Sequence, residues 1–291
     1  MNQAEAQSSR TAAAAGLPPL ELPVERIIAP AKRRLRLRDL LRERAVIGVL
    51  AGRDFKVKYK QSMLGPLWLV FQPLALLAAF FVAFRGIGDV QTSGVPYALF
   101  ALSGLAIWAF FQAAMTIGAV ALISNYHLIR FTPCPRPAFP IAGMIASLPS
   151  FAVTAAGTLT MAAVTGHLSV KVLLAPIVVV WLFVLTAGVV LLAAAVTVRY
   201  RDLQSALPFL LQVGVFLAPV GYAVGQLSEL VRGIVYLNPL TGVIEAWRWM
   251  VLSGYHSSIE PIAISLVMSV ALVSFGWRFF TRLETTMADD I

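Results

Sequence analysis

The chain has 291 residues, of which 59% are hydrophobic and 13% are charged, and its formal net charge is +9. Soluble domains carry about 25% charged residues, so this composition excludes an ordinary soluble protein and indicates an integral membrane protein. Because Cys134 is the single cysteine, an intrachain disulfide and a multi-cysteine metal site are both excluded.

The first 31 residues are rich in Ala, Pro and Gln and show no apolar periodicity, which predicts a disordered tail. The first apolar run begins only after the basic cluster Lys32 to Arg44. A secretory signal peptide has its basic residues directly before an apolar core, so we expect this tail to stay attached.

Residues 32–66 form a basic segment directly before an apolar run that ends at Phe84. Thirteen of the 23 Lys and Arg residues lie in the first 60 positions. Anionic lipid attracts such residues by about 1 kcal/mol each near a membrane, which favours lipid contact over nucleic-acid binding. Apolar and basic residues alternate over 55–60, as in a strand, but a lone strand at the surface has no pairing partner, so we expect an interfacial helix. The residues assigned to this surface are Arg53, Lys56, Lys58, Tyr59 and Lys60.

Membrane spans follow from the gaps between charges, because a charge at the bilayer centre costs about 2.5–3.5 kcal/mol. The charge-free windows are 61–84, 90–129, 137–170, 172–198, 203–228 and 261–277. Gly and Pro signals shorten the second and third windows to about 97–123 and 140–165. The sequence therefore predicts an all-α integral membrane protein with six transmembrane helices in a domain 67–283, followed by a cytoplasmic tail 284–291.

The distribution of basic residues predicts the orientation of these spans. If the N-terminal region, the second and fourth loops and the C-terminus share one side, that side carries 19 Lys and Arg residues and the other carries 4. The positive-inside rule places the richer side in the cytoplasm. We therefore expect a multi-pass protein of the plasma (inner) membrane with both termini cytoplasmic.

The loop 124–137 combines apolar residues with three prolines, and Pro140 follows shortly after. This pattern predicts a short amphipathic helix and a stiff connector back into the membrane. Two interpretations remain open for it. The loop rests on lipid headgroups, or the helix is a docking site for a partner protein.

The last outer loop, 225–258, holds apolar stretches too short to span a bilayer, broken at Asn238 and Pro239. It predicts two re-entrant helices. Glu229 with Arg232, and Glu245 with Arg248, are i, i+3 pairs that neutralise each other near the outer surface under this interpretation. The alternative is a solvated loop with incidental pairs.

No span contains Asp or Glu, so an ion-coupled transporter, which keeps ionisable residues within its spans, is disfavoured. The sequence also lacks a Gly-x-x-x-x-Gly-Lys-Ser/Thr phosphate loop, a Gly-x-Ser-x-Gly elbow and a His-Glu-x-x-His motif. If this protein performs active transport, we expect the motor to be another chain.

Three stretches resemble a known family, and the resemblance covers residues 40–283. They are Arg53-Asp54-Phe55-Lys56-Val57-Lys58-Tyr59-Lys60 with Leu64-Gly65-Pro66-Leu67-Trp68 and Gln72-Pro73-Leu74; Tyr200-Arg201-Asp202-Leu203 with Leu207-Pro208-Phe209 and Pro219-Val220-Gly221-Tyr222; and Leu237-Asn238-Pro239-Leu240 with Glu245-Ala246-Trp247-Arg248-Trp249. Their order and spacing are similar to those of ABC-2 type permeases that export polysaccharides.

The resemblance implies a homodimeric transmembrane subunit that binds two copies of a separate ATPase and moves a lipid-linked glycan outward, such as O-antigen, galactan or a teichoic acid. ATP and Mg would be bound by the ATPase, with no cofactor or metal in this chain. The interfacial helix would cover about 40–62 and a coupling helix about 124–132. The residues implied to contact the ATPase are Asn125, Tyr126, His127, Leu128, Ile129, Arg130, Phe131, Arg201 and Asp202. The family commonly has several charges in the coupling region, whereas this chain has only Arg130 between 126 and 135.

A glycan path needs aromatic faces that stack weakly on sugars, so that the polymer can slide. Many aromatic residues in spans instead face lipid or neighbouring helices. The candidates for the path are Trp68, Phe71, Tyr97, Phe100, Trp108, Phe111, Phe216 and Tyr222.

Two other functions remain open. An ABC-2 exporter of a small lipid or drug would share the fold, and a membrane scaffold or enzyme without transport would not need an ATPase. The absence of a catalytic constellation disfavours the enzyme.

Overall fold

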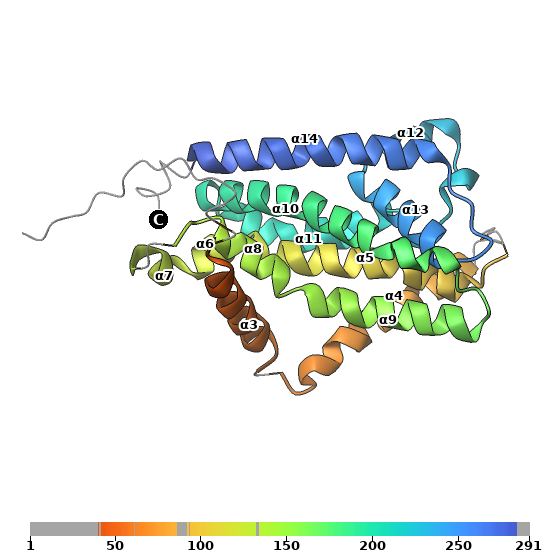
Figure 1. Ribbon diagram of the computed structural model, residues 1–291, viewed down its shortest axis with the longest axis horizontal. Helices are drawn as coiled ribbons and strands as arrows, with labels where there is room; N and C mark the ends of the chain where they lie inside the picture. Colours follow the sequence, from red (N-terminus) through yellow and green to blue (C-terminus); the bar gives the residue numbers. More distant parts are fainter. Residues whose placement is uncertain are drawn as a thin grey trace, which may run out of the picture. The chain divides into compact units, whose positions relative to one another are not determined.

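The computed structural model describes residues 40, 42–60, 62–85, 92, 94–131 and 134–283. The predicted tails 1–31 and 284–291 lie outside these residues. Within them every named element is a helix, and one isolated antiparallel bridge joins Leu168 to Leu252 (Figure 1). The elements are α3 (Arg44–Lys60), η1 (Gly65–Leu67), α4 (Trp68–Arg85), α5 (Tyr97–Gly118), α6 (Ala121–Ser124), α7 (Tyr126–Phe131), α8 (Ala138–Ile145), α9 (Leu148–Val164), η2 (Val170–Leu174), α10 (Ala175–Arg199), α11 (Asp202–Leu217), η3 (Val224–Gln226), α12 (Glu229–Tyr236), α13 (Pro239–Val251) and α14 (Ile259–Leu283).

Five stretches are long and apolar enough to cross a membrane, and they coincide with five of the six predicted spans. They are Gly65–Ala83, Tyr97–Gly118, Ala138–Val164, Val170–Arg199 and Ile259–Leu283. The all-α prediction and these five spans are therefore confirmed, and the chain is a multi-pass membrane protein.

The long helix in the remaining predicted span, 203–228, is α11, which has 16 residues and begins at Asp202. At 1.5 Å per residue α11 is about 24 Å long, shorter than the ~30 Å hydrocarbon core. The helix ends at Leu217 because Ala218 is extended, with φ −90° and ψ 140°, and precedes Pro219. A residue before proline is disfavoured in the helical region. The count of six spans stays a prediction.

Two apolar clusters hold the helices together. The larger one joins residues of α5, α10, α11 and α13. The smaller one joins α3, α6 and α8 to the last turns of α10 and to Phe280 of α14. Within the bundle α10 packs along α14, α5 packs along α9, and α13 lies against α14, α5 and α10.

The crossing of α10 and α14 depends on two glycines. A Cβ atom added to Gly276 would lie 2.3 Å from the carbonyl oxygen of Gly188, and one added to Gly188 would lie 2.7 Å from Cα of Val273. Small residues let transmembrane helices approach this closely. Nearby, the indole N–H of Trp181 on α10 donates to Ser269 on α14 at 2.8 Å.

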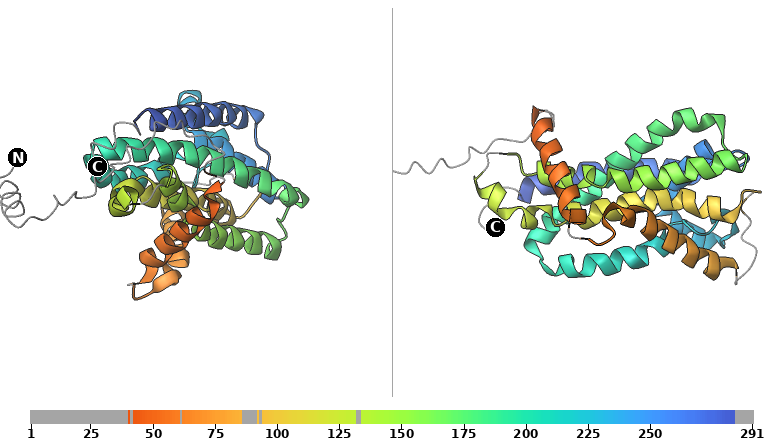
Figure 2. Two further views of the ribbon diagram at one scale, coloured as in Figure 1. Left: turned by 60° about the vertical axis from the view of Figure 1, so that its left-hand side comes forward. Right: turned by 90° about the horizontal axis from the view of Figure 1, so that it is seen from below.

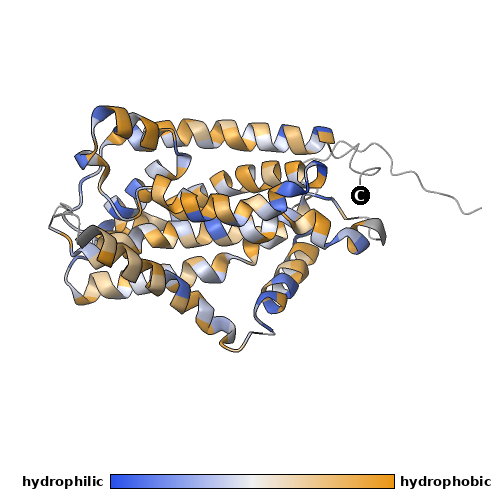
Figure 3. Ribbon diagram, turned by 180° about the vertical axis from the view of Figure 1, so that it is seen from behind, coloured by the Kyte–Doolittle hydropathy of each residue, from blue (hydrophilic) through white to orange (hydrophobic). Residues whose placement is uncertain are grey.

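Large apolar side chains remain exposed along α4, α11 and α14, and Figure 3 shows the hydrophobic colour running along the long helices. Examples are Phe71 on α4, Phe209 on α11 and Val267 on α14, each more than half exposed. Such continuous apolar faces are typical of surfaces that contact lipid or another chain.

Helix α3 crosses the end of the bundle at a steep angle (Figures 1 and 2). It packs on α8 through Ile47, Leu50 and Ala51. Gly65, with φ +49°, then turns the chain into η1 and α4, a conformation that L side chains rarely adopt. We call the end of the bundle where α3, α6, α7 and the α10–α11 turn lie the basic end, and the end that carries α12 the far end.

Candidate functional site

The loop predicted to dock a partner contains α7 at the basic end. Asn125 is buried between α6 and α7, His127 is exposed and Leu128 is 39% exposed. The ring of Tyr126 contacts that of His127 with centroids 4.9 Å apart, and Ile129 packs partly against the smaller apolar cluster. The backbones of Arg130 and Phe131 complete the helix, and their side chains lie outside the described part of the chain. A short helix followed by prolines therefore exists where the sequence predicts one.

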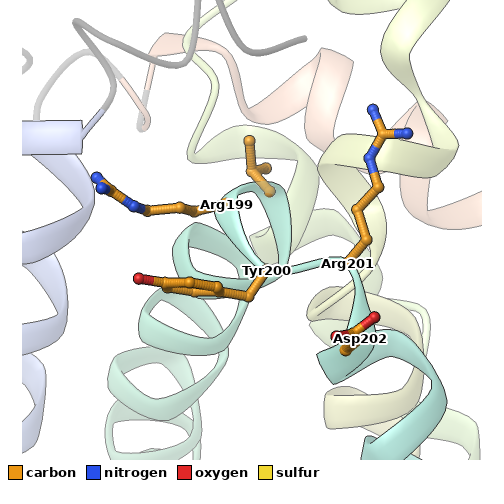
Figure 4. A pocket seen from close by; sticks show the side chains of 5 residues that line it. Arg199, Tyr200, Arg201 and Asp202 are labelled. Atoms are coloured by element: carbon orange, nitrogen blue, oxygen red, sulfur yellow. The ribbon is translucent and has the colours of Figure 1, made fainter.

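The turn between α10 and α11 is the second predicted contact. Residues 198–202 line an open depression of about 650 Å³. In Figure 4 the side chains of Arg199 and Tyr200 extend together, with the guanidinium carbon 5.9 Å from the ring centroid, while Arg201 extends to the other side. Asp202 lies in the first turn of α11, where a carboxylate interacts favourably with the helix dipole.

The predicted interfacial residues lie on α3, which confirms that this segment is a helix rather than a strand. Lys56, Lys58 and Lys60 are exposed, and Tyr59 is buried. Residues four apart share a helix face, so Lys56 and Lys60 project together while Lys58 lies on another side, with its Nζ 5.4 Å from the Tyr59 ring centroid. Burial raises the pKa of the Tyr59 phenol.

The structure joins two predicted sites that the sequence leaves separate. Arg53 of α3 donates a hydrogen bond through Nη2 to Oδ1 of Asn125, at the start of α7. The same guanidinium forms an ion pair with Asp54 at 2.6 Å. Arg53 and Asn125 are 72 positions apart, and no sequence pattern relates them.

At the far end, the break predicted at Asn238 and Pro239 is the start of α13. Oδ1 of Asn238 accepts a hydrogen bond from the Leu240 N–H at 3.0 Å, and Pro239 occupies the first turn. Both features are typical of helix N-termini. The two short helices predicted here thus exist as α12 and α13; whether they re-enter the membrane stays a prediction.

Glu245 and Arg248 form the predicted i, i+3 pair, with 3.5 Å between Nη1 and Oε1. Both side chains are buried, with Arg248 0% exposed and Glu245 6%, because α13 is packed inside the bundle. The position of this pair near the outer surface stays a prediction. The other predicted pair, Glu229 with Arg232, is absent among the contacts of the described residues. Arg232 instead donates to the carbonyl of Leu227 at 3.0 Å.

Arg248 binds two segments that lie far from it in the sequence. Its guanidinium donates to the Val220 carbonyl at 2.7 Å, to the Phe100 carbonyl at 3.3 Å and to the Ser103 hydroxyl at 3.3 Å. It also lies 3.6 Å from the centroid of the Phe100 ring. A cation here therefore ties α13 to α5 and to the connection after α11.

Tyr255 completes this buried cluster and was not predicted. Burial raises the pKa of its phenol, so the hydroxyl stays protonated and donates to the two carboxylate oxygens of Glu245, at 3.0 and 2.9 Å. A Glu-x-x-Arg pair in an otherwise apolar helix is the one sequence signal that points to such a cluster.

The candidate path aromatics fall into three groups. Trp68, Phe71 and Phe216 are exposed on α4 and α11. Tyr97, Phe111 and Tyr222 are half-buried, and the Tyr97 hydroxyl donates to the Gly221 carbonyl at 3.0 Å. Phe100 and Trp108 are buried in the larger apolar cluster, where the Trp108 indole donates to Gln112 at 3.1 Å.

These features define a multi-pass, all-helical membrane protein that carries the basic helix α3, the short helix α7 and the α10–α11 turn at one end. Residues 45–252 match the family described as ABC-2 type transporter, and the chain belongs to that family.

The chain is also similar to curated members of this class over most of their length. It is 26% identical over 243 residues to the O-antigen export system permease protein RfbA of Klebsiella pneumoniae, covering 83% of this chain and 93% of the relative. It is 24% identical over 258 residues to the protein of the same name from Myxococcus xanthus, covering 88% and 98%. The polysialic acid transport protein KpsM of Escherichia coli is 24% identical over 253 residues, covering 84% and 96%.

Proposed function

We propose that this chain is the membrane permease subunit of an ABC exporter that moves a lipid-linked polysaccharide outward across the plasma membrane. The observation that carries the proposal is the likeness to polysaccharide and O-antigen export permeases over 93–98% of their length. The family match at 45–252 contains α4 to α13 and all but the first residue of α3, and α14 lies beyond it.

ATP hydrolysis belongs to a separate subunit under this proposal. The chain has no phosphate loop, so ATP and Mg would be bound by the partner. The partner would contact the basic end through α7 and through Arg201 and Asp202 at the α10–α11 turn. Both surfaces lie at one end of the bundle, as a single ATPase docking face requires (Figure 1).

The basic end faces the cytoplasm in this proposal. It carries Arg53 and the three lysines of α3, Arg136 and the two arginines of the α10–α11 turn, and the positive-inside rule places such an end in the cytoplasm. α11 would then form a short sixth span, and α12 and α13 would return within the outer half of the membrane.

A second copy of the chain would enclose the path. In a single protomer, Trp68, Phe71 and Phe216 lie on exposed faces of α4 and α11 rather than in an interior channel. Phe216 packs on the buried ring of Phe80 of α4, with ring centroids 5.7 Å apart, so α4 and α11 are in contact at this point. Pairing the exposed faces of α4 and α11 in a homodimer would create a lined passage.

Depletion of the protein in its own organism tests this function. Lipid-linked glycan should accumulate on the inner face of the membrane while surface glycan falls, and re-expression should restore it. Normal surface glycan in depleted cells, together with loss of export of a small lipid or drug, would overturn the polysaccharide assignment and favour the other ABC-2 exporter function.

A further inference from the structure

The bond between Arg53 and Asn125 connects the helix that carries the interfacial lysines to the helix proposed to dock the ATPase. Around it, α3, α6 and α8 meet mainly through small and apolar side chains such as Ala51, Leu122 and Ala142. Apolar contacts are not directional, so surfaces of this kind can slide. The hydrogen bond from Arg53 fixes the position of α3 relative to the start of α7.

Asn125 is the joint between α6 and α7. Its backbone N–H donates to Ala121 at 3.1 Å and closes α6, while its carbonyl accepts from the N–H of Ile129 at 3.0 Å and opens α7. Its side-chain N–H donates to the Ala121 carbonyl at 2.8 Å. The Asn125 side chain is buried, so its oxygen needs a hydrogen-bond donor inside the protein, and Arg53 provides it.

Arg53 is held in place by its neighbour. Nε and Nη2 both donate to Oδ1 of Asp54, at 3.1 and 2.6 Å, and the Asp54 side chain is only 12% exposed. A guanidinium is a rigid fork, so fixing the Nε and Nη2 edge on Asp54 directs the second N–H of Nη2 at Asn125. Lys at this position would not reproduce this geometry.

We propose that Arg53 is a positioning residue that makes α3 move with α7 when the ATPase displaces α7. The proposal rests on the proposed function. α3 leads through the left-handed turn at Gly65 into α4, which belongs to the most exposed of the five candidate spans. Displacement of α7 would in this way also displace the interfacial lysines and the start of α4, where a lipid-linked substrate would enter.

The test measures transport and ATP hydrolysis in the same proteoliposomes, with the full chain, its co-expressed ATPase subunit and lipid-linked glycan extracted from the source organism. Arg53→Gln should retain the ATPase subunit and most ATP hydrolysis. Asn125 is among the residues implied to contact the ATPase, so transport by Asn125→Ala is compared per ATP hydrolysed by the subunit that it retains. Transport per ATP should fall by roughly tenfold or more, the effect expected from losing one charge-assisted hydrogen bond between two moving parts. The double variant should be no worse than the poorer single variant, because the two residues act as one unit.

Arg44→Gln is the matched control, since it removes one positive charge from an exposed position of the same helix. An unchanged ratio of transport to ATP hydrolysis in both single variants would overturn the proposal, and so would losses that multiply in the double variant. A fall in melting temperature at an unchanged ratio would show a purely structural bond and would also overturn it. If Asn125→Ala fails to accumulate, the ratio of transport to ATP hydrolysis in Arg53→Gln alone tests the proposal. The Arg53 side chain is 38% exposed, so this position tolerates substitution.

The wild-type arm separates this inference from the proposed function. A wild-type chain that recovers no ATPase subunit and moves no glycan contradicts the permease assignment itself. A wild-type chain that transports normally, beside variants with the wild-type ratio, contradicts only the role of Arg53.

Discussion

The guanidinium of Arg248 lies 3.5 Å from the carboxylate of Glu245, and the bundle buries both side chains. The pair is held by Tyr255 on the Glu245 side and by the carbonyls of Phe100 and Val220 on the Arg248 side. A buried ion pair with so many hydrogen bonds fixes α13 in register between α5 and the connection that follows α11.

Glu245→Ala and Glu245→Gln should both destabilise the protein, because each leaves the charge of Arg248 without its counter-ion. Removing one partner of a buried pair typically costs about 3–5 kcal/mol. Thermal unfolding of the purified protein in detergent measures the loss. Glu229→Gln is the matched control: Glu229 is exposed on α12, so its melting temperature should match the wild type. Equal melting temperatures for all three variants would show that the buried pair contributes nothing.

Gly276→Ala should disrupt the crossing of α10 and α14, since the new methyl group would lie 2.3 Å from the Gly188 carbonyl oxygen. Overpacking of this kind costs about 1–3 kcal/mol or more. Membrane abundance and detergent melting report on it. Gly233→Ala, on α12, has no heavy atom within 4 Å of the added Cβ and should behave like the wild type. Should the two variants prove equally stable, the helices do not approach as closely as described.

Leu128→Ala should weaken recovery of the ATPase subunit without reducing insertion, because Leu128 is an exposed apolar side chain on the proposed docking helix. An interface anchor is worth about 1–2 kcal/mol, or roughly five- to thirtyfold in affinity. Co-purification of the two chains measures this directly. Leu230→Ala makes the same change on α12 at the far end and should not affect recovery. Undiminished recovery with Leu128→Ala would favour α7 as a helix that rests on lipid headgroups.

Replacing Lys56, Lys58 and Lys60 with Gln should reduce export more than abundance. Three interfacial charges contribute together about 3 kcal/mol of attraction to anionic lipid or to a substrate pyrophosphate. Lys56→Gln with Lys60→Gln should account for most of the effect if one face of α3 binds the phosphate, because these two side chains share that face. Surface glycan and membrane abundance are measured side by side. Normal export at normal abundance would leave the lysines as topology signals only.

The long helices could be predicted from the sequence because charges are costly inside a bilayer. Arg199 ends α10 and Lys171 precedes it, so the charge-free window 172–198 nearly coincides with the helix. Helix ends inside apolar windows could not be predicted this way. Thus α5 ends at Gly118 rather than near 123, and α8 and α9 are separated by a turn at 146–147 that no charge marks.

The contacts of the candidate sites were only partly predictable, because they join residues far apart in the chain. The pairing of Glu245 with Arg248 follows from helical spacing, whereas the carbonyl partners of Arg248 come from α5 and from residue 220. When a helix is apolar all round, the sequence does not indicate whether an aromatic residue faces the bundle or its outside. For this reason Phe100 and Phe71 look alike in sequence, although one is buried and the other exposed.

Export of a lipid-linked polysaccharide is tested most directly in inverted membrane vesicles that contain this chain and its ATPase subunit. In such vesicles the cytoplasmic face is outside, so ATP added to the medium should drive radiolabelled lipid-linked glycan into the lumen, where glycan-cleaving enzymes cannot reach it. Vesicles that lack this chain should show no protection. Protection that appears without ATP or without this chain, or glycan that stays accessible in complete vesicles with ATP, would contradict the assignment of this protein as the permease.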